Sequence, residues 1–275
     1  MRAVPDLRRQ WFLWLTAAIT YVFLLGPILA IALASLEGHQ TYHFHFPPED
    51  LSLVWYARIP AKYFDALGIS LVVAIITACV ATLIGAAAAI GIVRGNRGSA
   101  GLLQGFFNLP LQIPQVVTGV VFLRFYNQLA ILSHIDFLGT LTGLVMAHVF
   151  VTIPYSVATV GSVLVRLNPR FEEAARTLGA AEWSVFRNVL LPTLKPGLFA
   201  GFFCAFIVSF GDVPIAVFLA SGEFVTLPVQ IFQSLQFDFE PAVLAMSTLV
   251  VIFSVLLIVT MQKLVGFELV LASAK

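Results

Sequence analysis

The chain consists of long apolar runs separated by short polar segments. Six runs reach the roughly 20 residues that a membrane-spanning helix needs. Backbone groups inside a bilayer must be paired within their own segment, which favours helices, and the runs lack the apolar–polar alternation of membrane β-strands. The sequence predicts an all-α integral membrane protein forming a single domain, 1–275, with spans at about 11–36, 66–93, 102–127, 140–165, 197–220 and 242–262.

The composition supports a membrane rather than an aqueous environment. Of the 275 residues, 60% are apolar and 11% are charged, and the mean hydropathy is +0.97. A soluble domain carries roughly 25% charged residues, and a soluble fold cannot remove this much apolar surface from water. The formal net charge of +1 offers no clustered basic face for nucleic acid. Lipid is therefore an expected partner and nucleic acid is not.

The basic residues predict the orientation of the chain. With the N-terminus in the cytoplasm, twelve of the 15 basic residues lie on the cytoplasmic side, and the outer loop 221–241 has none. This asymmetry follows the positive-inside rule and predicts a multi-pass protein of the bacterial inner membrane with both termini cytoplasmic. Arg8 and Arg9 before the first run, with a small-residue pattern at 32–34, resemble a signal peptide. Because signal peptides have apolar regions of only about 7–15 residues, an uncleaved span is favoured, and cleavage stays open.

One polar segment, 166–196, carries more local order than a plain connecting loop needs. Asn168 can cap a helix that follows it, and Gly179 is placed to end or bend that helix. A second helical piece, 181–191, is expected to stop at Pro192. Two capped, Ala-rich helices at the membrane face predict a docking surface for another protein on the cytoplasmic side.

Polar groups inside the third and fifth spans mark a candidate translocation path. In the third span, Gln112 and Gln115 lie beside two prolines, and helix packing and path lining are equally good readings of them. In the fifth span, Asp212 follows Ser209 and is the only acidic residue deep in a predicted span. A carboxylate there costs at least about 2.5–3.5 kcal/mol, so we favour a place on the path over a structural hydrogen bond.

Two further side chains have simpler explanations. Trp55, in the first outer loop, is most simply an interfacial aromatic, and a role on the path is the minority reading. His148, in the fourth span, is assigned no role, because a lone histidine in a helix is more often hydrogen-bonded within the bundle.

The polar segment closely matches a family motif. At these residues the chain resembles the permease subunit of a binding-protein-dependent ABC importer of type I, and most of all the second permease of spermidine/putrescine-type systems. The family's loop reads E-A-A, three residues, G, nine residues, then I-x-L-P. The matching positions are Glu173, Ala174, Ala175, Gly179, Leu191 and Pro192, with Val189 in place of Ile. Stretches around 109–115, 209–213 and 226–232 resemble the family as well.

The resemblance implies that this loop couples the permease to a motor. Two cytoplasmic ATPase subunits, which bind ATP and Mg, would grip the loops of this chain and of a second permease, and a periplasmic binding protein would deliver the solute. No P-loop motif is present, so we expect no cofactor, no catalytic residue and no enzymatic activity on this chain. His43 and His45 lack nearby cysteines or paired acids, so no metal site is expected.

The substrate expectation depends on two departures from the polyamine-type pattern. Such relatives tend to carry an acidic pair in span five, where this chain has Gly211 and Asp212. They also tend to carry an acid at the position of Gln115. Because carboxylates offset the desolvation of a polycation, we expect a small polar organic solute, such as an amine, an amino acid derivative or an opine-like compound, with a polyamine as the alternative. An ion-coupled carrier using Asp212 is less favoured because internal repeats are lacking. A membrane enzyme lacks a catalytic constellation.

Overall fold

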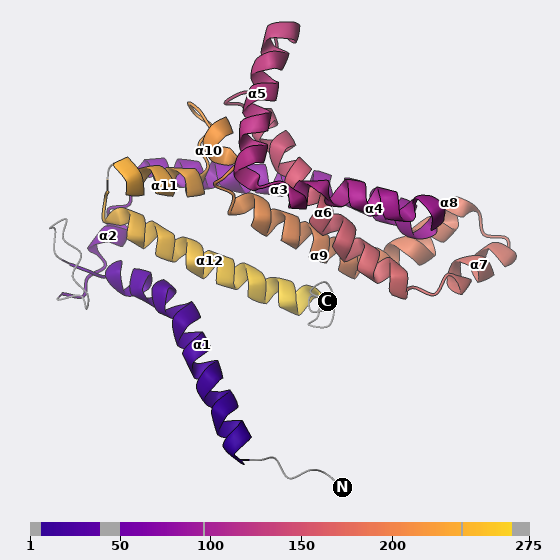
Figure 1. Ribbon diagram of the computed structural model, residues 1–275, viewed down its shortest axis with the longest axis horizontal. Coiled ribbons are helices and arrows are strands. Elements are labelled where there is room, and N and C mark those ends of the chain that lie inside the picture. Colours follow the sequence, from indigo (N-terminus) through magenta and orange to yellow (C-terminus); the bar gives the residue numbers. More distant parts are fainter. Residues whose placement is uncertain (1–6, 39–49, 96, 238, 266–275) are drawn as a thin grey trace. The chain divides into compact units, whose positions relative to one another are not determined.

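The structure, a computed structural model, describes residues 7–38, 50–95, 97–237 and 239–265, which are mostly helical (Figure 1). In the described ranges the only isolated extended pairing is one antiparallel bridge between Glu37 and Leu51. Six helices are long and apolar enough to cross a membrane, namely Trp11–Ala34, Ala61–Arg94, Gln115–Ser133, Leu141–Arg166, Glu182–Phe210 and Ala242–Lys263. The predicted all-α fold with six membrane-spanning helices is therefore confirmed. The histidines weighed above as metal ligands, His43 and His45, lie outside the described residues.

The chain folds into two compact units. The first contains the described residues up to Tyr63 together with Gln233–Ser254, and the second contains Phe64–Phe232 and the described residues from Val255. In chain order the helices are α1 (Leu7–Ala34), α2 (Val54–Ala57), α3 (Ala61–Arg94), α4 (Arg97–Gln112), α5 (Gln115–Ser133), α6 (Leu141–Arg166), α7 (Arg170–Thr177), α8 (Glu182–Val185), the π-helical turn η1 (Phe186–Leu190), α9 (Leu191–Phe210), α10 (Ala216–Leu219), α11 (Leu227–Phe237) and α12 (Ala242–Val265).

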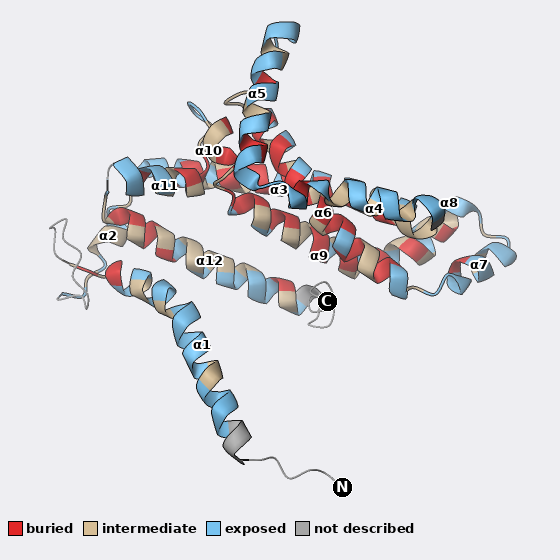
Figure 2. Cartoon of the chain, viewed as in Figure 1, coloured by how far each residue is buried: buried red, intermediate tan, exposed pale blue. Residues whose placement is uncertain are grey.

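The first unit is held by hydrogen bonds near its short helix α2 and at the start of α3. Ser35 and Tyr56 share a hydroxyl–hydroxyl hydrogen bond of 2.7 Å, and the Tyr63 hydroxyl donates to Ser234 Oγ at 2.8 Å. Helix α1 is buried only at its C-terminal end, and its apolar side chains are otherwise exposed (Figure 2). A helix that is apolar on all sides is stable only in lipid or against other protein.

The second unit is built around α6, and α9 packs along it. Glycines let the neighbouring helices approach α6 closely. A β-carbon added at Gly201 of α9 would lie 2.9 Å from Thr159 Oγ1, and one added at Gly85 of α3 would lie 2.5 Å from Ser156 Cβ. Small residues at such contacts are typical of helix packing in membranes, where close van der Waals contact replaces the hydrophobic effect.

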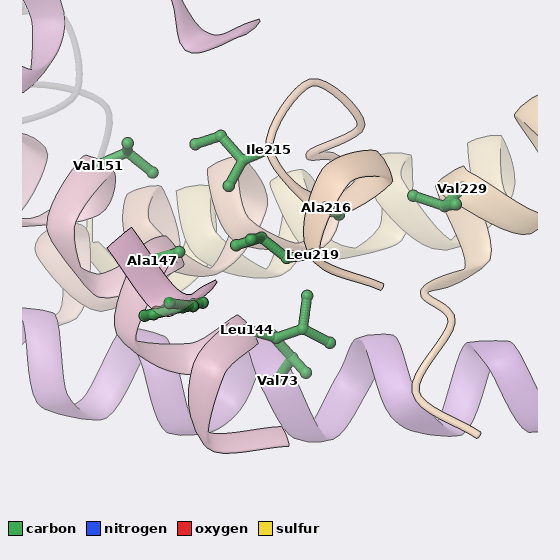
Figure 3. Close-up of a cluster of buried hydrophobic side chains, with 9 residues drawn as sticks. Val73, Leu144, Ala147, Val151, Ile215, Ala216, Leu219 and Val229 are labelled. Carbon is green, nitrogen blue, oxygen red and sulfur yellow. The ribbon is translucent and has the colours of Figure 1, made fainter. Parts of the chain in front are cut away.

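A buried apolar cluster fills the second unit where α3, α5, α6, α10 and α11 meet (Figure 3). Inside it, the Tyr126 hydroxyl donates to the carbonyl of Gly143 at 2.8 Å, which satisfies the one polar group of that ring. The cluster consists of Val73, Tyr126, Leu144, Ala147, Val151, Ile215, Ala216, Leu219 and Val229.

The third span differs from the sequence prediction. The expected single helix, 102–127, is wrong, because α4 ends at Gln112 and a separate helix, α5, begins at Gln115. Pro114 takes an extended conformation (φ −54°, ψ 129°). A proline has no N–H to donate and also disfavours helix at the residue before it. The apolar helix that can cross a membrane is therefore Gln115–Ser133, which starts after the proline.

Candidate functional site

The polar segment between α6 and α9 forms a helical hairpin, here called the polar hairpin (residues 167–190). At its start, Asn168 Oδ1 accepts a hydrogen bond of 3.0 Å from the backbone N–H two residues later. At the end of α7, Gly179 takes a positive φ of 85°. The N–H groups of Gly179 and Ala180 donate to carbonyls of the last helical turn at 2.9 and 3.1 Å, which is a Schellman motif. The predicted glycine end is present, whereas the N-cap position of α7 is Pro169 and Asn168 binds from one residue before it.

A chain of four charges fixes the polar hairpin. Arg94, the last residue of α3, donates to Glu172 Oε1 at 2.7 Å, and Arg176 lies 3.9 Å from the other oxygen of that carboxylate. Arg176 also donates to both oxygens of Glu182, at 2.7 and 3.1 Å, across the turn. The hydrogen bond to Glu182 raises the pKa of Arg176 above its usual value. Sequence reasoning missed this network, although Glu172 and Arg176 stand one helical turn apart.

Large apolar side chains of the polar hairpin remain exposed. Leu178 is 88% exposed, and Phe171 and Trp183 are more than half exposed. Apolar patches exposed on a polar segment are typical of surfaces that contact a protein or a membrane. The hairpin thus combines a fixed backbone with an uncovered apolar surface.

Four of the predicted coupling residues lie on or next to this surface. Glu173 and Ala174 are exposed on α7, and Ala175 beside them is half-buried. Gly179 is exposed at the tip of the turn, where an added β-carbon would meet nothing within 4 Å. Shape at Gly179 is therefore set by its backbone conformation and not by crowding.

The other two predicted coupling residues lie inside a longer helix than expected. The expectation that the second helical piece, 181–191, stops at Pro192 is wrong, because the helix continues as Glu182–Phe210 into the fifth span. Leu191 is half-buried and Pro192 is exposed. The π-helical turn before them, in which the N–H of Leu191 donates to the carbonyl of Phe186, widens the helix. This wider turn gives room for a proline ring that would otherwise clash with the preceding turn.

The fifth span is broken near its other end. The predicted single span, 197–220, is wrong there, because α9 ends at Phe210 and only the short α10 follows. Asp212 explains the new start, since its Oδ1 accepts hydrogen bonds from the N–H groups of Ile215 (3.0 Å) and Ala216 (2.9 Å). A side-chain oxygen that takes up these free donors stabilises a new helical turn after the break.

Two predicted path residues belong to a buried polar cluster, defined here as His148, Ser209 and Asp212. His148 Nδ1 lies 2.8 Å from Ser209 Oγ, and His148 Nε2 lies 3.8 Å from Asp212 Oδ1. Each of the three residues is at most 4% exposed. The structure therefore gives His148, which received no role from the sequence, a central position. Within the described ranges, no three His, Cys, Asp or Glu residues are grouped to hold a metal ion.

The remaining predicted path residues lie around two different features. Gln112 and Gln115 are exposed on either side of the α4–α5 break. One turn further along α5, a β-carbon added at Gly119 would lie 2.8 Å from the carbonyl oxygen of Pro214. The third-span segment and the span-five break are thus in contact at Gly119. Trp55 belongs to the first unit, where it is half-buried in α2.

Comparison with known proteins agrees with this arrangement. Residues 81–269 match the family model described as "Binding-protein-dependent transport system inner membrane component". The chain is 30% identical over 255 residues to the putrescine transport system permease protein PotI of Escherichia coli K12. The aligned region covers 91% of this chain and 89% of PotI. It is 26% identical to the spermidine/putrescine transport system permease protein PotC of the same strain, covering 88% and 89%.

Solved structures show the same fold at lower sequence identity. A chain of the bacterial alginate ABC transporter, in complex with its pentasaccharide-bound periplasmic protein, superposes with a TM-score of 0.72 at 15% identity, covering 97% of this chain and 98% of that one. Six apolar helices, a structured polar hairpin and a broken fifth span define a membrane-spanning transport subunit. The chain belongs to the family of binding-protein-dependent transport system inner membrane components, and it is a permease subunit of an ABC importer.

Proposed function

We propose that this permease moves a small polar organic solute, best described as an amine, across the bacterial inner membrane. A periplasmic binding protein delivers the solute, and ATP bound with Mg on two separate ATPase subunits drives the cycle. A second permease chain completes the pathway. Relatives named for putrescine and spermidine transport support an amine, with a polyamine as the alternative within the same class.

The observation that carries the coupling role is the exposed apolar surface of the polar hairpin. Leu178 and Trp183 are uncovered, while the backbone that presents them is fixed by the charges of Glu172 and Arg176. A surface that is ordered before binding loses little conformational entropy when a partner docks. We assign this surface to the ATPase subunits, with Glu173 and Gly179 at its edge.

The orientation follows from the same assignment. If the hairpin meets a cytoplasmic ATPase, then α6 ends in the cytoplasm at Arg166. The helix that leads into the fifth span, Glu182–Phe210, then begins in the cytoplasm. This direction agrees with the positive-inside rule and places both termini of the chain in the cytoplasm. A cysteine introduced at the exposed Thr177 and labelled with a membrane-impermeant maleimide tests it, because labelling should require broken cells.

The amine preference rests on charge as well as on the relatives. Asp212 is buried in the span-five break and is the one carboxylate there. A single buried carboxylate suits a compound with one cationic amine better than it suits a polycation, because each extra positive charge needs its own compensation. We therefore place monoamines and amino acid derivatives ahead of polyamines such as putrescine and spermidine.

Transport by the reconstituted assembly tests the proposal. The permease pair, the ATPase subunits and the binding protein are placed in proteoliposomes, and uptake of radiolabelled putrescine, spermidine and octopine is compared with and without internal ATP. We expect uptake of at least one of them only with ATP. Uptake by the permease alone, driven by a proton or sodium gradient, would instead establish the secondary-carrier alternative built on Asp212.

A further inference from the structure

The carboxylate of Asp212 is only partly satisfied. Its Oδ1 accepts both N–H groups at the start of α10, from Ile215 and Ala216, whereas its Oδ2 is buried and has no hydrogen-bond partner. A buried, unpaired carboxylate oxygen is costly. The arrangement therefore needs another group that favours the negative charge in this place.

His148 is the side chain that lies beside this carboxylate, and one of its two neutral tautomers suits both of its neighbours. Its Nδ1 is 2.8 Å from Ser209 Oγ, and its Nε2 is 3.8 Å from Asp212 Oδ1 with no hydrogen bond of its own. If Nε2 carried no proton, its lone pair would face the carboxylate. The favourable arrangement has the Ser209 hydroxyl donating to Nδ1 and the Nε2–H directed at Asp212.

We propose that His148 is a positioning residue for the span-five break. Its Nε2 lies 3.8 Å from Asp212 Oδ1, too far for a hydrogen bond, and the Nε2–H favours the carboxylate at the start of α10 by electrostatic attraction. Ile215 and Ala216, whose N–H groups Asp212 accepts, are themselves members of the apolar cluster with Ala147, the neighbour of His148 (Figure 3). The contact therefore links α6 to the residues that start α10, next to apolar packing between the same two elements.

The contact between His148 and Asp212 can be broken at little cost in hydrogen bonds. Nε2 of His148 and Oδ2 of Asp212 both lack a hydrogen-bond partner in this structure. Each therefore gains a hydrogen bond if the span-five break opens to water or to a polar solute. In the transport cycle, which rests here on the proposed function, Asp212 reaches a solute only after His148 has released it. The residue predicted to lie on the path is thus covered in this state and exposed by opening.

Backbone hydrogen exchange on the full-length chain in lipid nanodiscs tests this contact directly. The amides of Ile215 and Ala216 report whether Asp212 still caps α10. We expect His148→Phe, which keeps a ring but removes both nitrogens, to speed exchange at these two amides at least tenfold. His148→Gln, whose amide N–H stands near the position of Nε2–H, should restore at least part of the protection.

Two variants make the result decisive. Tyr126→Phe removes a polar atom from the same buried region, but that hydroxyl bonds only Gly143, so exchange at Ile215 and Ala216 should stay unchanged. Ser209→Ala deletes a single oxygen and retains the packing, and it should speed exchange because Nδ1 loses its donor. Unchanged exchange in both His148→Phe and Ser209→Ala overturns the proposal. If His148→Phe does not fold, Ser209→Ala alone decides.

Transport provides the second readout. In the reconstituted assembly, with putrescine as the probe, His148→Phe should lower uptake at least fivefold in the wild-type background. It should have no further effect in an Asp212→Asn background, because the residue acts through that carboxylate. Additive losses would contradict a positioning role. A wild-type assembly that moves no putrescine would count against the proposed amine and would leave the exchange result standing.

Discussion

Arg94 and Glu172 join the C-terminal end of α3 to the polar hairpin through a 2.7 Å hydrogen bond. Both side chains are largely withdrawn from solvent, with 24% and 9% of their surfaces exposed. The pair is therefore a fixed point of the hairpin and not a mobile surface contact. A movement of the polar hairpin is therefore expected to move the end of α3 through this pair.

Arg94→Ala should loosen the polar hairpin. Removing one partner of a fully buried pair costs 3–5 kcal/mol, and since Arg94 is part exposed we expect about 2 kcal/mol. Thermal unfolding and limited proteolysis of the purified full-length chain measure it. Arg187→Ala changes another arginine of the hairpin for which no ion pair is seen in the described residues, and it should leave both readouts unchanged. Equal effects of the two variants would show that the Arg94–Glu172 pair does not fix the polar hairpin to α3.

Gly179→Ala should strain the turn without crowding it. Gly179 has φ +85° and open space around the missing β-carbon, so the cost is the backbone term alone, about 1–2 kcal/mol. We expect reduced ATP-driven uptake with the chain still inserted in the membrane.

Gly161→Ala is the matched control for that change, because this glycine also has open space but lies inside the helix α6. Alanine is favoured over glycine there by about 1 kcal/mol, so stability should hold or rise. If both variants lose uptake equally, the positive φ of Gly179 is not the cause.

Gly85→Ala should separate α3 from α6. Its β-carbon would come within 2.5 Å of Ser156 Cβ and 3.0 Å of the backbone nitrogen of Val157, and overpacking of this kind costs about 1–3 kcal/mol. The expected result is a lower midpoint of thermal unfolding. Gly91→Ala, on the same helix but with nothing within 4 Å, should not lower it, because alanine favours a helix over glycine. A drop in both variants would show that the contact of Gly85 with Ser156 is not the cause.

Leu178→Ala should weaken binding of the ATPase subunits. This side chain is 88% exposed in the chain alone, and an apolar anchor buried on docking contributes at least about 1–2 kcal/mol, or roughly tenfold in Kd. Surface plasmon resonance with the permease in nanodiscs measures the change. Leu53→Ala, which removes a side chain exposed to 67% in the first unit, should bind normally. Normal binding by Leu178→Ala would remove Leu178 from the interface.

The sequence predicted most of the fold because the length of an apolar run is a local property that a membrane-spanning helix requires. The ends of the helices were harder. Pro192 was expected to stop a helix, but the π-helical turn before it makes room for the ring, and a widened turn leaves no simple pattern in the residues. The reverse error occurred at Pro114, where a long apolar run hid a break between α4 and α5.

The candidate site was predictable only in part, for a related reason. Gly179 and Asn168 act within a few residues of themselves, so their roles in the turn could be read from the sequence. His148 acts across 61 residues on Ser209, and Arg94 acts across 78 on Glu172. Such pairs are set by how helices pack, and one sequence alone does not contain that information.

The continuous helical segment Glu182–Phe210, which includes the π-helical turn Phe186–Leu190, has a mechanical consequence. Its 29 residues correspond to about 43 Å at 1.5 Å per residue, with the exposed Trp183 near one end and Gly211 just past the other. A stiff rod of that length converts rotation into displacement, since a 10° tilt about its midpoint moves each extremity by roughly 4 Å. Under the proposed coupling role, a small displacement of the polar hairpin would therefore move the end of this helix that lies next to Asp212.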